Sequence, residues 1–415
     1  MKKVLFSLVT LMIFSVSFLG QNHRDITVKR GWNFAPFPAL GYNSDMGLQY
    51  GVIGDIYYFG DGSKFPEYEH KFNVEASRYT QGSSVLHLFY DSKYLLKGVR
   101  SSFDISYLSD KMMDFYGYNG YQSPYSVDSS AAYYKFERKV FRVLADFSGK
   151  LSNRIEWTLG VGLYGFKTGE VTLDKYVGEN SLYKEYVANG IISEEDSEGG
   201  SRIEIKAGLV HDTRDNEADP QRGFYSEAIL TGSPDLGLGG TSYLKFTLVN
   251  RGYFSPFDKK VTFAYKIGLQ NKVFGDIPFY LMPNISTTYM KQTTSEGLGG
   301  YTTIRGVLRN RIVGEGIFWT NFEARVRLFD FRFFGQDWYF SLNPFFDAGI
   351  ITDKVSIDTS LVSIISSDKE SLHMSVGSGI KAVMNRNFVI SVEAGKALDS
   401  RDGDMGLNVG LNYIF

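Results

Sequence analysis

The sequence predicts an all-β protein, a transmembrane antiparallel β-barrel of about 16 strands. Three observations predict this fold. The chain opens with a segment typical of export, and apolar and polar residues then alternate along most of the remaining chain. The final segment is an alternating strand that stops on an aromatic residue.

The first residues predict a secretory signal peptide. Lys2 and Lys3 precede an apolar run from Val4 to Leu19, and Gly20 comes next. A positively charged N-terminal region, a short apolar stretch and small residues at the cleavage site are typical of a signal peptide. A membrane-anchoring helix needs about 20 apolar residues. We therefore expect residues 1–20 to be the signal peptide, residues 21–32 a short periplasmic segment and residues 33–415 the barrel. The chain has no cysteine, which excludes a lipoprotein and a disulfide scaffold.

Composition limits the class of protein. The chain holds 33 Phe, 28 Tyr and 44 Gly in 415 residues, which is rich in aromatic residues and glycine for a soluble domain. Its formal net charge of −2 offers no basic footprint for nucleic acid. No apolar stretch beyond residue 20 is long enough for a membrane helix.

Alternation with a period of two indicates strands that have one apolar and one polar face. In one example, Ile203, Ile205, Ala207 and Leu209 share a face, and Arg202, Glu204, Lys206 and Gly208 share the other. A soluble sandwich also alternates, but a polar face of Gly, Ser, Asn and paired charges is typical of a barrel lumen. Every backbone N–H and C=O group of a strand that crosses a bilayer needs a hydrogen-bond partner within the protein, so such strands form a closed barrel.

The last segment has the same pattern. From Met405 to Phe415 apolar residues alternate with Gly and Asn, and Tyr413 and Phe415 are aromatic. This segment resembles the signal by which bacterial outer-membrane barrels are recognised, which implies the barrel assembly machinery as a partner during biogenesis. The alternative is an ordinary closing strand.

Three segments resemble motifs of one family. The first is the glycine-rich loop Gly299–Val307, the second is Asp212–Asp215 followed by Pro220–Gly223, and the third is Phe345–Gly349. In this order they resemble the BamA/TamA-type outer-membrane assembly and secretion barrels, the bacterial surface antigen family. The motif in the loop ends on Val307 where the family has an aromatic residue.

The resemblance implies that the long loop at residues 274–314 is extracellular and folds into the lumen. Counting outward from it gives sixteen strands with both termini on the periplasmic side. The expected strands are 33–43, 47–60, 68–80, 82–92, 98–109, 131–149, 154–168, 201–212, 223–232, 241–253, 261–273, 315–328, 337–350, 371–385, 387–397 and 403–415. The longest connections then fall outside, at 110–130, 169–200 and 351–370, and residues 181–193 are expected to form a short helix.

The resemblance also implies a latch between this loop and the lumen wall. Strand parity points Glu323 inward with Arg325, and Asp347 inward with Phe345. Arg305 at the loop tip is then expected to reach both carboxylates, since a guanidinium suits bidentate contacts. The alternative is three solvated, unpaired lumen charges. The expected latch residues are Arg305, Gly306, Glu323, Phe345 and Asp347, and the expected turn motif is Asp212, Arg214, Asp215, Pro220 and Gly223.

Two features depart from better-known family members. Residues 21–32 leave no room for the periplasmic POTRA modules, so a barrel-only member is expected. The first strand also contains Pro36 and Pro38, and proline removes a donor from the sheet ladder. Either these prolines weaken the seam between the first and last strands, or they precede the paired region.

Enzymatic activity is not expected. The histidines at positions 23, 70, 87, 211 and 373 lie in no hydrolase or metalloprotease motif, and His373 is interpreted as a polar wall residue. Asp212, Asp215 and Asp219 lack the spacing of a calcium loop. We expect no catalytic residue, cofactor or metal.

Two functions remain open for an outer-membrane barrel of this kind. One is protein or lipid translocation or assembly at the outer membrane, which rests on the family resemblance. The alternative is a passive pore or a partner-binding structural barrel without insertase activity. Expected partners are outer-membrane lipid and a client polypeptide or periplasmic partner, with a homodimer as a further possibility and no nucleic acid.

Overall fold

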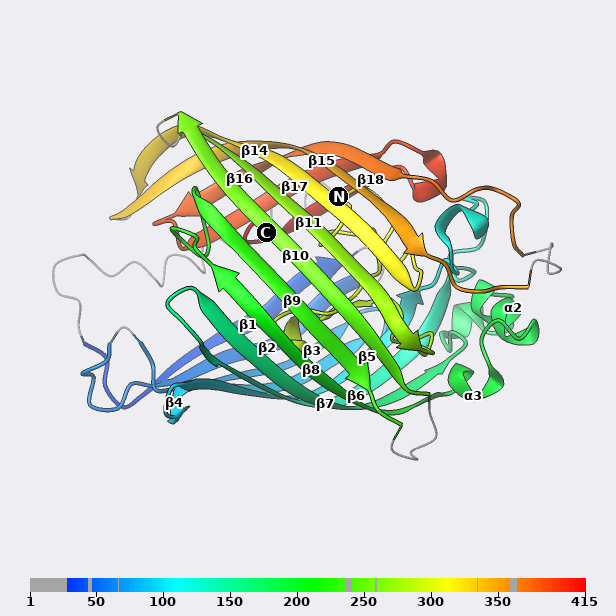
Figure 1. Ribbon diagram of the computed structural model, residues 1–415, viewed down its shortest axis with the longest axis horizontal. Coiled ribbons are helices and arrows are strands. Elements are labelled where there is room, and N and C mark those ends of the chain that lie inside the picture. The colour runs from blue at the N-terminus through cyan, green and yellow to red at the C-terminus, as the bar shows by residue number, and fades with distance from the viewer. Residues whose placement is uncertain are drawn as a thin grey trace.

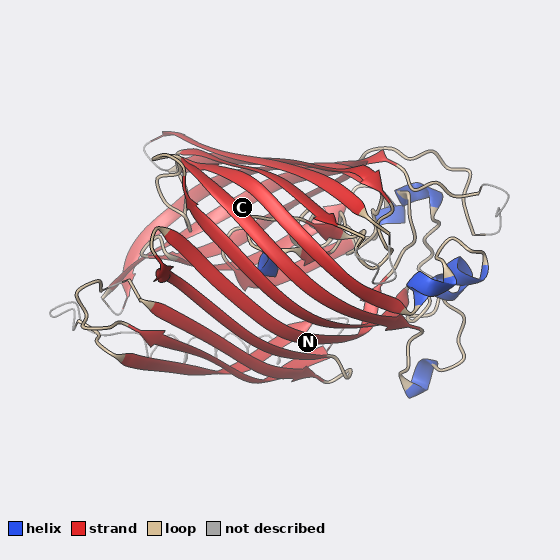
Figure 2. Cartoon of the chain, turned by 60° about the horizontal axis from the view of Figure 1, so that its bottom comes forward, coloured by secondary structure: helices blue, strands red, loops and turns tan. Residues whose placement is uncertain are grey.

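The computed structural model describes residues 28–43, 47–65, 67–235, 241–257, 260–333, 335–358 and 364–415. Sixteen antiparallel strands form one sheet in which each strand pairs with the next in the chain. The sheet curls into a barrel, seen from two directions in Figures 1 and 2. This confirms the predicted fold class. The expected signal peptide, residues 1–20, lies outside the described residues.

The bounds of the strands agree with the alternation to within a few residues at most ends. The barrel strands are β1 Trp32–Asn43, β2 Gly47–Tyr58, β3 His70–Tyr79, β4 Ser84–Leu96, β5 Val99–Asp114, β6 Lys135–Lys150, β7 Ile155–Gly169, β8 Gly199–Asp212, β9 Gly223–Ser233, β10 Tyr243–Phe257, β11 Val261–Gly275, β14 Gly316–Phe333, β15 Gln336–Asp353, β16 His373–Met384, β17 Phe388–Ala397 and β18 Met405–Leu411. A short hairpin, β12 Asn284–Ile285 with β13 Thr294–Ser295, lies between β11 and β14.

Side-chain parity sorts the wall into two faces. On β7, Leu159, Val161 and Leu163 are exposed on the outside, and Thr158 is buried on the inside. The same division holds along most of the length of the other strands, with exposed aliphatic and aromatic side chains outside. Because the outer face is apolar and the inner face polar, the wall suits a lipid exterior and a polar lumen.

The two ends of the barrel differ in the length of their connections. Residues 115–134, 170–198, 276–315 and 354–372 connect strands at one end, here called the loop end. Residues 151–154, 213–222, 334–335 and 385–387 connect strands at the other end, here called the turn end. In Figure 1 the loop end carries the helices α2 and α3. The predicted asymmetry of the connections is confirmed.

The expected helix near residues 181–193 is present. Helix α2 spans Leu182–Ala188, and its first turn is capped by Ser181, whose Oγ accepts a hydrogen bond from the backbone of Lys184. The four-residue helix α3, Glu194–Ser197, comes after it. Among the described residues, no helix is long and apolar enough to cross a membrane.

A cluster of aromatic side chains covers the loop end. The loops after β5, β7 and β11 meet there, and Phe115 makes edge-to-face contacts with Tyr186 and Phe279. Such ring pairs add to the free energy gained by burying their area. We call this cluster the aromatic cap; its buried rings are Phe115, Tyr116, Tyr118, Tyr134, Phe136, Tyr164, Phe166, Tyr183, Tyr186, Tyr243, Phe279 and Tyr280.

The structure decides between the two interpretations of the first strand. Pro36 pairs with Gly54 and Pro38 pairs with Val52, so both prolines lie inside the paired region of β1. Residues two apart direct their backbone nitrogens to the same edge, so both missing donors share one edge of the strand. Proline is tolerated on an edge that lacks a partner, which places the missing donors on the free edge of β1.

The last strand is shorter than predicted. Strand β18 ends at Leu411, and Asn412 takes a left-handed backbone conformation with φ 67°. Asparagine accepts this conformation more readily than most residues, so it redirects the chain. The prediction that residues 412–415 continue the strand was wrong.

Candidate functional site

The loop between β11 and β14 enters the barrel and packs against its inner wall. Leu298, Ile304 and Ile312 of this loop are fully buried and join Trp319 of β14 in one cluster. The loop includes a 3-10 helix at Met290–Gln292, and Figure 2 shows loop segments with a short helix inside the barrel. The loop therefore occupies the lumen, as the prediction required.

The tip of the loop is a tight turn. Thr303 Oγ1 donates to the carbonyl of Gly299 at 2.9 Å, and the backbone of Gly300 donates to the carbonyl of Val307 at 2.8 Å. Gly306 has φ +91°, and a Cβ at this position would lie 2.4 Å from the backbone of Gly395 on β17. Only glycine permits this conformation together with this approach. The turn presents Arg305 to the wall.

Arg305 binds carboxylates from three different strands. Its Nε and Nη2 donate to the two oxygens of Asp347, each at 2.8 Å. Its Nη1 donates to Glu323 at 2.6 Å and to Glu393 at 2.9 Å. The guanidinium also lies 3.5 Å from the ring centre of Phe345. The predicted latch residues thus meet, and Glu393 on β17 joins them.

Further cations complete the site. Arg325 Nε donates to Glu323 at 3.0 Å, and Lys381 Nζ lies 2.9 Å from Glu393. We call the six residues Arg305, Glu323, Arg325, Asp347, Lys381 and Glu393 the latch cluster; all are buried. Its three formal positive charges match its three formal negative charges, which is the condition for holding ions away from water at tolerable cost.

Glu393 and Lys381 were not among the residues predicted for the latch. The signal for Glu393 was present in the sequence, because Phe388, Ile390 and Val392 alternate outward and place position 393 on the inner face. What the sequence alone did not indicate is that the loop tip reaches β17 as well as β14 and β15.

The last residues of the chain also lie in the lumen. Arg325 Nη2 donates to the backbone oxygen of Phe415 at 2.8 Å, and its guanidinium lies 3.8 Å from the ring centre of Tyr413. Tyr413 and Phe415, expected to be the aromatic end of a wall strand, are buried, whereas Leu411 is exposed on the outer face. The turn at Asn412 therefore connects the end of the chain to the latch cluster.

The predicted turn motif spans the connection from β8 to β9. Arg214 Nη2 donates to Asp212 at 2.7 Å, and the Asp215 carboxylate accepts from the backbones of Gln221 and Arg222 at 2.8 Å and 3.1 Å. Pro220 is buried within the same turn, and Gly223 has φ +99° and lies against the backbone of Thr213. These contacts hold the turn in one conformation.

Arg386 connects this motif to a distant turn. It lies between β16 and β17, and it donates to Asp215 at 2.9 Å and to Asp219 at 3.1 Å. Burial alone would raise the pKa of Asp215, but hydrogen bonds from the Gln221 backbone and from Arg386 hold that pKa below its ordinary value. The motif thus joins two turns at the turn end, a role that its sequence did not predict.

His373 is the centre of a second buried polar group, at the loop end. Its Nδ1 lies 2.8 Å from Asp402 and its Nε2 lies 2.9 Å from Glu370, and the ring of Tyr121 stacks on it with centroids 4.1 Å apart. Both ring nitrogens face carboxylate oxygens, so the imidazolium is the form that satisfies both acceptors. The interpretation of His373 as an ordinary wall residue was wrong, because it joins three loops.

No group of three or more His, Cys, Asp or Glu side chains in the described part of the chain is placed to hold a metal ion. The chemistry that the latch cluster supports is ion pairing and hydrogen bonding, which hold one element of a chain against another.

Comparison with known proteins identifies the family. A model of the Omp85 superfamily domain matches residues 69–410, a span that includes the turn motif and the whole latch cluster. The chain belongs to the Omp85 superfamily. The predicted family resemblance is confirmed, and as an Omp85 barrel the protein belongs to the bacterial outer membrane.

Solved structures agree on the fold of this Omp85 barrel. BamA from Haemophilus ducreyi lacking POTRA domains 1-3 matches with a TM-score of 0.58 and 15% identity, over 92% of this chain and 70% of that chain. CdiB from Escherichia coli matches with a TM-score of 0.58 and 11% identity, over 92% of this chain and 61% of that chain. No curated protein matches the sequence at a significant level.

Proposed function

We propose that this Omp85 barrel translocates or inserts a polypeptide at the outer membrane by opening the seam between β1 and β18, while its lumen stays plugged. The observation that carries the proposal is the combination of a filled lumen with two unpaired edge strands. The loop is latched across the lumen by Arg305, and the sheet order of the described residues places β1 and β18 at its two ends with no pairing between them.

The two edges differ from the interior strands in ways that favour separation. Strand β18 has seven residues, and β1 carries Pro36 and Pro38. A short edge and an edge that lacks two backbone donors form fewer mutual hydrogen bonds than two interior strands do. A strand from a client polypeptide could pair with the unpaired backbone groups on the edge of β1 and on the edge of β18.

The proposed orientation is based on the connections. Single-chain outer-membrane barrels have short turns in the periplasm and long loops outside. On this basis the turn end and both termini are periplasmic, and the aromatic cap is extracellular. The proposal includes no catalytic step and no cofactor.

A crosslink across the seam tests the proposal. The chain has no cysteine, so a thiol crosslinker can join Phe34→Cys to Leu411→Cys, two outward positions on β1 and β18 at the turn end, and thereby hold the seam closed. The matched control is Phe34→Cys with Ile56→Cys, since these positions already pair in β1 and β2. Depletion of the protein should cause envelope defects that the control rescues and the closed seam does not. Equal rescue by both would contradict the proposal.

The competing proposal is a passive barrel that binds a partner or conducts solutes. The ordered aromatic cap favours it, because a rigid outer surface suits a platform. Planar-bilayer conductance of the whole protein beside a deletion of residues 296–310 separates the two. Low, flickering conductance that becomes large on deletion indicates a plugged barrel, and large conductance in both indicates a pore.

A further inference from the structure

The outer wall carries an aromatic groove near the turn end, across β9, β10, β11, β14 and β15. Its volume is about 930 Å³. The outward side chains that line it are Phe224, Phe254, Phe263, Tyr265, Phe322, Ala324, Pro344 and Phe346. From these residues we infer that the groove binds one acyl chain of a phospholipid in the adjacent leaflet, with the lipid phosphate at Arg222.

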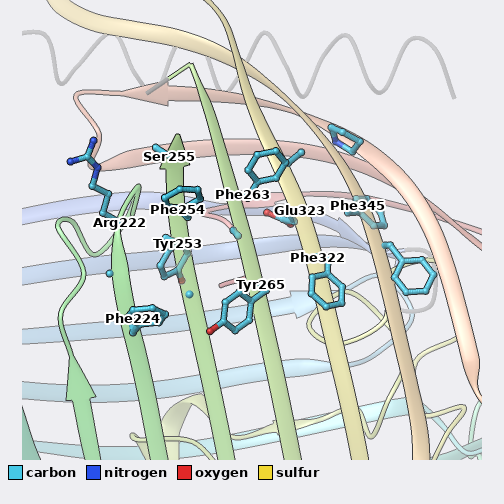
Figure 3. Close-up of a pocket in the computed structure, with 16 residues that line it drawn as sticks. Arg222, Phe224, Tyr253, Phe254, Ser255, Phe263, Tyr265, Phe322, Glu323 and Phe345 are labelled. Carbon is cyan, nitrogen blue, oxygen red and sulfur yellow. The ribbon is translucent and has the colours of Figure 1, made fainter. Parts of the chain in front are cut away.

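The register of the strands builds the groove from two rows. In the first row Phe224 pairs with Gly252, Gly252 with Tyr265, and Tyr265 with Phe322. In the second row Phe254 pairs with Phe263, and Phe263 with Ala324. Rows that are two residues apart along a strand lie about 7 Å from each other. Figure 3 shows the second row nearer to the turn end.

The floor and the walls of the groove have different heights. A Cβ on Gly252 would lie 2.3 Å from the ring of Tyr265, so this ring lies flat over the glycine. Ala324 adds only a methyl group to the floor. By contrast, the walls stand out from the sheet: Phe224, Phe254, Phe263 and Phe322 are 50%, 65%, 48% and 47% exposed. The result is an apolar channel with ring walls, of a size typical of ligand sites.

A cation stands at the turn end of this channel. Arg222 lies two residues before Phe224, beside the turn that precedes β9, and its side chain is exposed (Figure 3). Its backbone donates to Asp215, whereas its guanidinium has no carboxylate partner among the described residues. A guanidinium at the membrane surface beside an apolar channel matches the two halves of a phospholipid, since it binds phosphate through paired donors.

The position of the groove indicates its occupant. It opens on the apolar outer face of a membrane barrel, where the surrounding medium is lipid, and it is away from the β1–β18 seam. Acyl chains bury apolar area there, and ring walls fixed by cross-strand pairing lose little conformational entropy on binding. In the proposed orientation the leaflet is the periplasmic one. The inference is otherwise independent of translocation.

Native mass spectrometry of the whole purified protein tests the inference, with palmitoyl-oleoyl phosphatidylglycerol as the probe. The variant Ala324→Phe fills the floor, and Ala207→Phe places the same ring on the exposed outer face of β8 as a matched control. The wild type and Ala207→Phe should retain one lipid, and Ala324→Phe should bind about tenfold more weakly. Equal lipid retention by all three proteins, or equal loss of lipid in both variants, contradicts the inference that the groove binds the lipid.

The headgroup is tested separately. Arg222→Gln should reduce binding of phosphatidylglycerol to the level of the diacylglycerol with the same chains, which lacks phosphate. Arg154→Gln, at another turn of the same end, is the control. If Arg222→Gln binds as the wild type does, the assignment to a phospholipid is wrong. If Ala324→Phe does not show the heat-modified mobility of a folded barrel, Phe263→Leu is the variant to use in its place. It shortens one wall of the groove without adding bulk and should also weaken lipid binding.

Discussion

Nη1 of Arg305 lies 2.9 Å from Oε1 of Glu393, although 88 residues separate the two in the chain. The same nitrogen donates to Glu323, so one guanidinium joins the loop to β14 and β17, and through Asp347 to β15. The latch is therefore a junction of four segments, and its removal affects each of them.

Arg305→Ala should destabilise the barrel by about 3–5 kcal/mol, because it leaves buried carboxylates without their shared cation. Glu393→Gln should cost less, since the amide keeps an acceptor for Arg305, whereas Arg305→Ala takes a donor from three carboxylates. Unfolding in urea, followed by heat-modified gel mobility, measures both. Arg332→Ala is the control, because that side chain is 65% exposed. A loss for Arg305→Ala no larger than for Arg332→Ala contradicts the latch.

His373→Gln should loosen the loop end. Glutamine donates to one carboxylate where the imidazolium donates to two, so either Glu370 or Asp402 loses its hydrogen bond from residue 373. We expect faster hydrogen exchange at residues 116–123, the segment that Tyr121 ties to Asp402. His211→Gln, on β8, serves as the control. Unchanged exchange in this segment would show that neither the ion pairs nor the ring stack of His373 holds the loop.

The turn motif should make stability depend on pH in acid. The pKa of Asp215 is lower in the folded protein than in the unfolded chain. Its stabilising contribution is therefore complete above the unfolded value, about pH 4, and is lost as the pH falls through the folded value. Asp215→Asn should lower the unfolding midpoint at pH 7 and reduce the difference between pH 7 and pH 3. Asp337 is exposed, so Asp337→Asn should leave the midpoint at pH 7 and the difference between pH 7 and pH 3 unchanged. If Asp215→Asn keeps the pH dependence of the wild type, Asp215 is not its source.

The inward turn at Asn412 predicts a pattern of thiol reactivity. In single-cysteine variants of the folded barrel in detergent, Tyr413→Cys should be protected from an apolar thiol reagent that enters the micelle, and Leu411→Cys should react. Adding Asn412→Val should raise the reactivity at position 413, because a β-branched residue disfavours the left-handed conformation by about 1–2 kcal/mol. If positions 411 and 413 react alike, the last four residues do not enter the lumen.

The sequence by itself determined the strands and their two faces. A period of two is a local property of the extended backbone, so Leu159, Val161 and Leu163 indicate an outward face without knowledge of the neighbouring strands. The core of the latch was implied by the family resemblance of the motif around Arg305, and the inward parity of Glu323 and Asp347 is a property of short segments.

Only the tertiary structure decided which distant groups meet. Curling the sheet brings Glu393 to Arg305, Arg386 to Asp215, and Glu370 and Asp402 to both nitrogens of His373. The left-handed turn at Asn412 directs Tyr413 and Phe415 into the lumen that the curled sheet encloses. These contacts join separate strands and connections, whose separation in space depends on the curvature of the whole sheet. Periodicity shows which way a side chain points, but the curvature of the barrel decides what it meets.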